Sequence, residues 1–163
     1  MAEDGKHEGK WEGKVSAKLK TPITAEQVWP LLADFCNLHK WHPDVATCHP
    51  AHAPDAGPAQ AGAIRYCASR AVPPEAAVKW ARERLIEIDP IGRRLRYEVQ
   101  DNNVGFTYWI ATMGVAAVDG GGCEIEWSFV GEPPEGWSYG DVLSYYEFCI
   151  KSMANKMEHA LLN

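Results

Sequence analysis

Two opposite charges fall at positions where strand pairing would bring them together. Arg65 and Glu83 lie in two segments of β-like sequence that are joined through Pro73-Pro74. In a hairpin symmetric about residue 74 they stand directly opposite each other, with Cβ atoms about 5 Å apart on one face. A carboxylate in this position can transfer a proton, and a guanidinium can hold an oxyanion. The pair is therefore our candidate for catalysis.

The face that carries this pair supports a functional interpretation. Its other residues are small or apolar, namely Ala63, Cys67, Ala81 and Leu85. Charge is costly in such surroundings unless the two groups pair or serve a ligand. The alternatives are a structural cross-strand salt bridge, or a register shift that turns one of the two side chains outward.

Several aromatic residues are candidates for lining a cavity on the same face, namely Tyr97, Trp109, Trp127 and Trp80. Each of them also fits a simple core position. Strict alternation places Trp80 on the face opposite Glu83, so either a bulge intervenes or Trp80 points outward.

A second group of reactive side chains invites a metal interpretation. Its members are Cys36, His39, His42, Cys48, His49 and His52. Their spacing matches no structural zinc pattern, so we expect no metal, with the histidines at a helix end and in loops. The five cysteines form no Cys-x-x-Cys pair, and we expect packed, reduced thiols.

The elements that position these residues follow from hydrophobic periodicity. Seven strands are expected, at residues 11–19, 45–52, 63–70, 76–88, 95–99, 106–118 and 123–129. A helix capped by Thr24 and a short helical piece at 36–41 come after the first strand. A long helix over 139–162 ends the chain. Short connections favour an antiparallel sheet, and hence an α+β architecture.

Composition limits the function classes. The chain has 163 residues, which suits one domain over 11–163 behind a disordered leader at 1–10. Its net charge of -6, from 16 basic and 22 acidic residues, argues against nucleic-acid and anionic-membrane partners. Without a signal peptide or a membrane-length apolar run, we expect a cytoplasmic protein. The oligomeric state cannot be predicted from these data.

Several motifs resemble one family along nearly the whole chain. The stretch 27–35, QVWPLLADF, is similar to that of plant lachrymatory-factor-synthase-like proteins, and so are 62–66, GAIRY, and 80–85, WARERL. The segment 126–129, EWSF, resembles them too. These proteins form a polyketide cyclase/dehydrase branch of the START and birch-pollen-allergen-like superfamily. The resemblance implies a helix-grip fold: a seven-stranded curved antiparallel sheet around the long C-terminal helix, with two short helices after strand 1, enclosing a cavity.

The same resemblance implies a site. It assigns a catalytic arginine and glutamate to Arg65 and Glu83, and cavity aromatics to Tyr97 and Trp127. Trp109 and Phe106 stand where the family enzyme has tyrosines, so the cavity here is bulkier and has fewer hydroxyls.

Two functions follow as expectations. The first is a cofactor-free enzyme that isomerises, cyclises or dehydrates a small apolar molecule, as in the family's conversion of a sulfenic acid to a thial S-oxide. Glu83 would move the proton while Arg65 steadies negative charge. The alternative is a non-catalytic binder or carrier of a hydrophobic plant metabolite, lipid or hormone.

Overall fold

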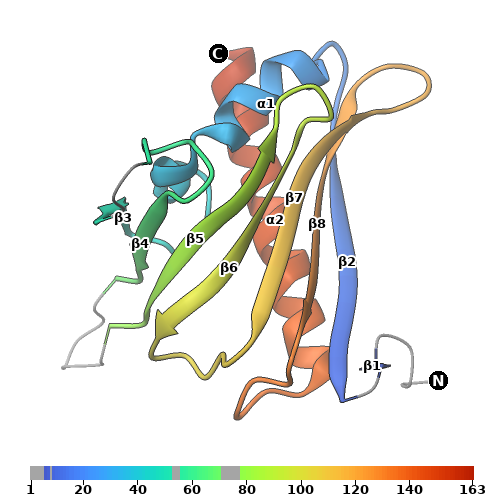
Figure 1. Ribbon diagram of the computed structural model, residues 1–163. Helices are drawn as coiled ribbons and strands as arrows, with labels where there is room; N and C mark the ends of the chain where they lie inside the picture. The colour runs from blue at the N-terminus through green and yellow to red at the C-terminus, as the bar shows by residue number, and fades with distance from the viewer. Residues whose placement is uncertain (1–5, 8, 53–55, 71–77) are drawn as a thin grey trace.

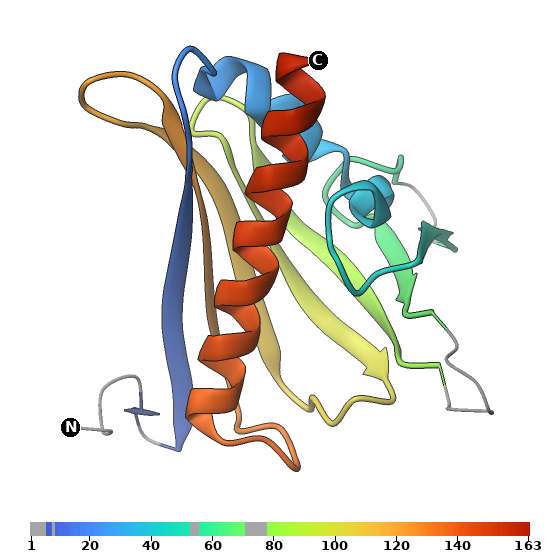
Figure 2. The same cartoon turned by 180° about the vertical axis from the view of Figure 1, so that it is seen from behind.

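One curved antiparallel sheet wraps around a long helix (Figures 1 and 2). The computed structural model describes residues 6–7, 9–52, 56–70 and 78–163. Its sheet has the order β1-β2-β8-β7-β6-β5-β4-β3. The strands are β1 (Lys6–His7), β2 (Lys10–Leu19), β3 (Thr47–Ala51), β4 (Ile64–Ala68), β5 (Trp80–Asp89), β6 (Arg94–Asn102), β7 (Trp109–Ala117) and β8 (Cys123–Gly131). The helices are α1 (Ala25–Ala33), the 3₁₀ helix η1 (Phe35–Lys40) and α2 (Tyr139–Leu162).

This arrangement confirms the expected α+β helix-grip fold. The seven expected strands are present, and the two-residue β1 adds an eighth by pairing with Lys10 and Trp11. β1 lies inside the expected leader, of which residues 1–5 and 8 lie outside the described part. The predicted strand 76–88 begins at Trp80 instead, with 76–77 also outside that part.

The strand expected from residue 106 begins only at Trp109 because a turn precedes it. The Asn102 side-chain oxygen accepts hydrogen bonds from the backbone N–H groups of Val104 and Phe106, at 3.0 and 3.1 Å. Its amide nitrogen donates to the Phe106 carbonyl oxygen at 2.9 Å. An asparagine that satisfies the backbone in this way stabilises a turn in place of a sheet ladder. Phe106 is therefore placed in a turn beside the sheet.

Helix α2 covers the concave face of the sheet along its length (Figure 2). A capping box begins it, since Ser138 accepts from the Asp141 N–H at 3.0 Å and Asp141 accepts from the Ser138 N–H at 3.0 Å. Its buried stripe has the three-and-four spacing of an amphipathic helix and consists of Val142, Tyr146, Cys149, Ile150, Met153, Ala154 and Met157. This stripe brings Tyr146 to the same interior as the sheet's aromatic residues.

The two short helices close one end of the sheet beside the C-terminal part of α2 (Figures 1 and 2). Thr24 and Gln27 form the predicted capping box at the start of α1. η1 follows after Asp34 and contacts β3 and β4. The chain therefore places the Phe35 backbone close to Arg65 on β4.

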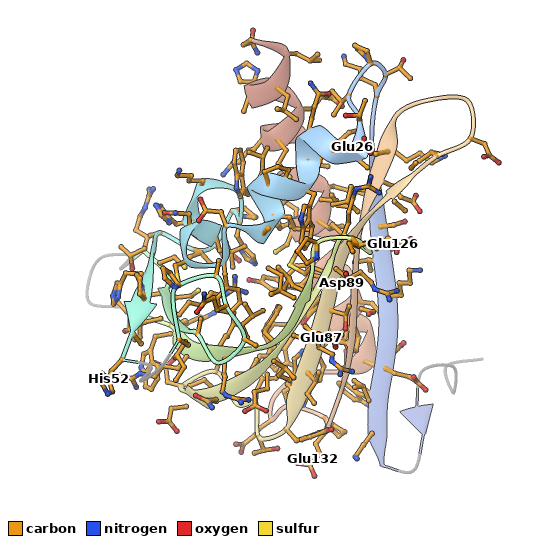
Figure 3. The ribbon with its side chains drawn as sticks, turned by 45° about the horizontal axis from the view of Figure 1, so that its top comes forward. Glu26, His52, Glu87, Asp89, Glu126 and Glu132 are labelled. Atoms are coloured by element: carbon orange, nitrogen blue, oxygen red, sulfur yellow. The ribbon has the colours of Figure 1, made fainter. Side chains whose placement is uncertain are left out.

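Charged side chains occupy the outer face of the sheet and its loops. Figure 3 shows Glu132 projecting from the lower edge of the sheet, and the side chains of Glu87 and Glu126 are 61% and 30% exposed. Arg96 pairs with Glu87 at 3.3 Å, and Lys14 pairs with Glu126 at 3.4 Å. No helix in the described residues combines the length and the apolar character that crossing a membrane requires.

A glycine allows the close packing of Trp109 against the neighbouring strand. Gly131 pairs directly with Trp109, and a Cβ atom there would collide with the Tyr108 carbonyl oxygen and the Trp109 ring. We expect Gly131→Ala to lower the free energy of unfolding by about 1–3 kcal/mol, because the backbone itself must move.

Gly140, in the first turn of α2, provides the matched control. A Cβ there meets only the Ser138 hydroxyl, at 3.9 Å. Gly140→Ala is expected to be neutral or to stabilise by up to about 1 kcal/mol. Urea unfolding measures both variants, and equal effects would contradict the packing argument.

Candidate functional site

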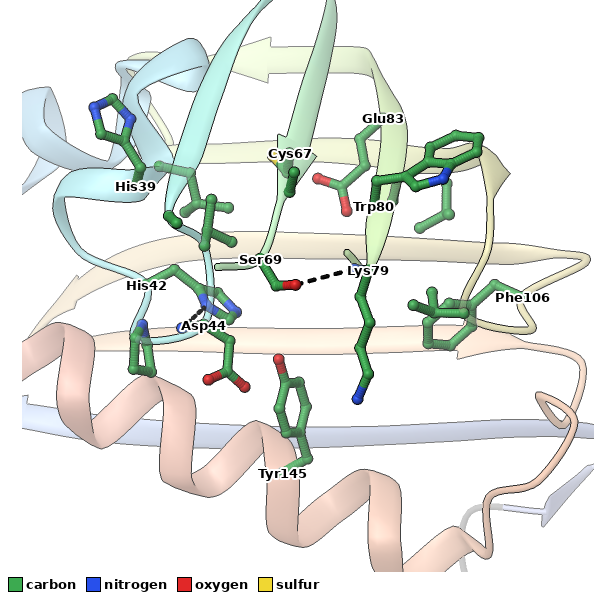
Figure 4. A pocket seen from close by; sticks show the side chains of 18 of the residues that line it. His39, His42, Asp44, Cys67, Ser69, Lys79, Trp80, Glu83, Phe106 and Tyr145 are labelled. Atoms are coloured by element: carbon green, nitrogen blue, oxygen red, sulfur yellow. Dashed lines mark hydrogen bonds between the residues drawn. The ribbon is translucent and has the colours of Figure 1, made fainter. Parts of the chain in front are cut away.

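A cavity of about 840 Å³ lies between the concave face of the sheet, the η1–β3 segment and α2 (Figure 4). Its size is typical of sites for small organic molecules. Much of its lining is apolar, including Leu38, Val45, Val99, Phe106, Trp109 and Trp127. Glu83 is an acidic group on this wall, and Figure 4 shows its carboxylate among the lining side chains.

Arg65 and Glu83 form the predicted cross-strand pair. β4 and β5 pair in the expected register, which puts the two residues directly opposite each other. The Arg65 Nε and Nη2 atoms lie 2.8 and 2.7 Å from the same oxygen, Glu83 Oε1. Glu83 Oε2 has no hydrogen-bond partner among the described residues, so this oxygen remains available to a ligand.

The guanidinium lies behind the carboxylate instead of facing the cavity. Arg65 is 2% exposed, is absent from the cavity lining and donates from Nη1 to the Phe35 carbonyl oxygen at 2.8 Å. The Arg65 Cζ atom lies 4.0 Å from the centroid of the Phe35 ring and 4.8 Å from the centroid of the Tyr97 ring, so both rings cover the guanidinium. Burial acts to lower the pKa of Arg65, but the Glu83 carboxylate raises it, and the net pKa lies above its ordinary value. Arg65 therefore stays cationic and orients Glu83.

Two indole–phenol pairs form much of the inner wall. Trp109 donates from Nε1 to the Tyr146 hydroxyl at 2.8 Å, and Trp127 donates from Nε1 to the Tyr97 hydroxyl at 3.2 Å. All four side chains line the cavity and are almost fully buried. Tyr146 was not among the predicted site residues, because its spacing in α2 is that of an ordinary core position.

The two remaining aromatic candidates have different positions. Phe106 lines the cavity and packs on Trp109 with ring centroids 4.8 Å apart. Trp80 borders the cavity, but its ring stacks on Tyr66 at 5.9 Å, on the face opposite Arg65. The role of Trp80 as a substrate contact therefore stays a prediction: Trp80 is part of the cavity lining, while its ring stacks on that of Tyr66.

His42 is a second lining residue outside the predicted cavity set, since the sequence analysis considered it only for metal binding. Its Nδ1 accepts a hydrogen bond from the Asp44 N–H at 3.1 Å, and its ring meets the Trp127 ring edge-on at 5.9 Å (Figure 4). Burial lowers the pKa of His42 to about 4, although Asp44 opposes this shift. His42 is thus neutral near pH 7 and carries its proton on Nε2.

The described cysteine and histidine side chains do not assemble a metal site. All five cysteines are buried and unpaired, and Cys48 and Cys67 face each other across β3 and β4 with Sγ atoms 3.4 Å apart. Among the residues that the structure describes, no three His, Cys, Asp or Glu side chains gather in a way that could hold a metal ion.

A curved sheet around a long helix, with an aromatic cavity whose wall carries the Arg65-bound Glu83 carboxylate, is the architecture of a START-like ligand-binding domain. The chain belongs to the polyketide cyclase/dehydrase and lipid transport family, whose model matches residues 12–158. The narrower lachrymatory-factor-synthase-like assignment stays a prediction.

Solved structures share this fold. The ginseng major latex-like protein 151 from Panax ginseng matches with a TM-score of 0.71 and 13% identity, over 95% of this chain and 99% of that chain. The protein XoxI from Bacillus cereus matches with a TM-score of 0.70 and 20% identity, over 93% of this chain and 96% of that one. At these identities the likeness shows the fold alone. Family and fold together support a ligand-binding or cyclase-type role.

Proposed function

We propose that this protein is an acid–base enzyme that isomerises, cyclises or dehydrates a small, largely apolar molecule inside its cavity. The observation that carries the proposal is the Glu83 carboxylate, which is held through Oε1 by a buried guanidinium and leaves Oε2 free on the cavity wall. Such a group can take a proton from a bound molecule and return it at another atom.

Arg65 has a supporting role in this proposal. Because its donors are directed at Glu83 and Phe35, it holds the carboxylate in one orientation and contributes a fixed positive charge behind it. The sequence-based expectation that Arg65 itself steadies negative charge on the substrate is thus replaced by a positioning role.

The family resemblance suggests one finer substrate, an alkenyl sulfenic acid. In its conversion to a thial S-oxide, a proton leaves the S–O–H oxygen, a proton is added to the far carbon of the double bond, and a C=S bond replaces the C=C bond. No atom or electron is gained overall. Glu83 would relay this proton, so the reaction needs no group beyond the cavity's own residues.

A carrier of hydrophobic molecules is the second candidate. The volume of about 840 Å³ and the largely apolar lining favour it, and the family description includes lipid transport. A carrier releases its ligand chemically unchanged, whereas an enzyme does not.

Incubation with a plant metabolite extract distinguishes the two candidates. Mass spectrometry would follow both the consumed molecules and those bound to wild type, Glu83→Gln and Arg65→Leu. We expect wild type to convert a compound that Glu83→Gln binds but leaves intact. If all three proteins carry the same unaltered compound, the enzyme proposal fails and the carrier function stands.

A further inference from the structure

Two of the three tyrosines that line the cavity, Tyr97 and Tyr146, each have a hydroxyl hydrogen that no described acceptor takes up. Tyr97 and Tyr146 accept one indole N–H apiece, at 3.2 and 2.8 Å. Within the described part of the chain, neither hydroxyl has an acceptor for its own hydrogen. An O–H group whose oxygen already accepts a hydrogen bond becomes a stronger donor through polarisation. Both tyrosines line the cavity and are themselves 3% and 6% exposed, so that hydrogen is available to a molecule bound there.

Both hydroxyls lie in the electrostatic neighbourhood of Glu83 and of each other. Burial raises the pKa of Tyr97 well above its ordinary value, and the Glu83 carboxylate and Tyr146 raise it further. Burial also raises the pKa of Tyr146, with Glu83 adding to the rise and the Trp109 hydrogen bond opposing it. Both phenols therefore stay protonated at neutral pH and act as donors. Among the described residues neither hydroxyl is hydrogen-bonded to Glu83, and all three side chains line the same cavity.

The guanidinium does not line the cavity, so it is not a donor on the cavity wall. Arg65 donates from Nε to Glu83 and from Nη1 to the Phe35 carbonyl oxygen, Nη2 lies 2.7 Å from Glu83 Oε1, and the Phe35 and Tyr97 rings lie over the guanidinium. When a base removes a proton from carbon, negative charge develops on an oxygen conjugated to that carbon. Donors aimed at this oxygen stabilise the charge most in a site without bulk water.

We propose that Tyr97 and Tyr146 form a two-donor oxyanion site, which makes the substrate a small apolar molecule with a carbonyl-type oxygen next to an acidic C–H bond. This inference rests on the proposed function of Glu83. Glu83 takes the proton, the C–H electron pair becomes a C=C bond, and the C=O π pair moves to the oxygen held by the two hydroxyls. The protonated Glu83 returns the proton to another atom of the conjugated system, which completes an isomerisation without any co-reactant. Trp109 and Trp127 are positioning residues that orient the hydroxyls.

A phenolate tests the site without turnover, because its charged oxygen mimics an enolate. The probe is 4-nitrophenol, whose visible absorption reports the ionised form. It is bound to the Glu83→Gln variant, in which the amide stands in for the protonated carboxyl group of Glu83. We expect this protein to bind the phenolate, and the added Tyr146→Phe or Tyr97→Phe change to weaken that binding at least about tenfold. The neutral analogue 4-nitrotoluene should bind all these variants about equally, which shows that the cavity remains folded.

Tyr66→Phe in the same background is the matched control, because Tyr66 lies next to Arg65 but on the outer face of the sheet. It should leave phenolate binding unchanged. The proposal is overturned if 4-nitrophenol does not bind, binds only in its neutral form, or binds equally well after loss of either cavity hydroxyl. Phenolate binding that depends on both tyrosines, in a protein that converts nothing in the extract, would retain the oxyanion site and reject the enzyme instead.

Discussion

Arg65→Met is expected to lower the free energy of unfolding by about 3–5 kcal/mol, because it leaves Glu83 without its counter-charge in a buried setting. The side chains of Arg65 and Glu83 are only 3% and 15% exposed. The variant also removes the donor to the Phe35 carbonyl oxygen, and an orphaned buried acceptor adds to the cost. Urea unfolding followed by tryptophan fluorescence measures the change.

Two further variants make this prediction specific. Arg65→Met combined with Glu83→Leu is expected to recover a large part of the lost stability, because no uncompensated charge remains. Arg96→Met removes an exposed pair with Glu87, whose side chains are 49% and 61% exposed, and should cost at most about 1 kcal/mol. If Arg65→Met lowers the free energy of unfolding no more than Arg96→Met does, then the Arg65–Glu83 pair does not behave as a buried ion pair.

The parts of the fold that depend on local pattern were predictable from the sequence. The alternating residues of β2 and β8 and the stripe of α2 follow directly from the periods of strand and helix. The Arg65–Glu83 register was predictable too, since the observed pairing is the one expected of a hairpin symmetric about residue 74.

The parts of the site that depend on distant segments were not predictable in this way. Tyr146 occupies a regular core position of α2, and only the three-dimensional structure brings its hydroxyl to the Trp109 indole, 37 residues away. Arg65 was expected on the concave face, but the alternation of a strand does not predict how deeply a side chain is buried on that face. In the structure, Phe35 of η1 covers the guanidinium. His42 follows η1 in a loop, where the sequence has no periodicity from which its direction could be inferred.

Glu83→Gln should lower turnover of the substrate by about 10²- to 10⁴-fold, the usual contribution of a positioned acid–base group. The amide has the shape of the carboxyl group and still accepts a hydrogen bond from Arg65, but it cannot take up a proton at neutral pH. Ligand binding should therefore persist, since the apolar lining is unchanged. Single-turnover measurements with the compound identified in the extract separate the loss of chemistry from any loss of binding.

Glu83→Asp tests whether position matters as well as charge. It keeps the counter-charge for Arg65 but withdraws the carboxylate by one methylene group, so we expect turnover between those of wild type and Glu83→Gln. Thermal unfolding is expected to place Glu83→Gln below Glu83→Asp as well, because Arg65 is left without a full negative charge. Turnover is therefore compared per folded, ligand-bound molecule, at a temperature where both variants are folded. Wild-type turnover in both variants under these conditions would mean that Glu83 only supports the fold. Turnover that is lowest in Glu83→Gln while the ligand stays bound would mean that the carboxylate moves the proton.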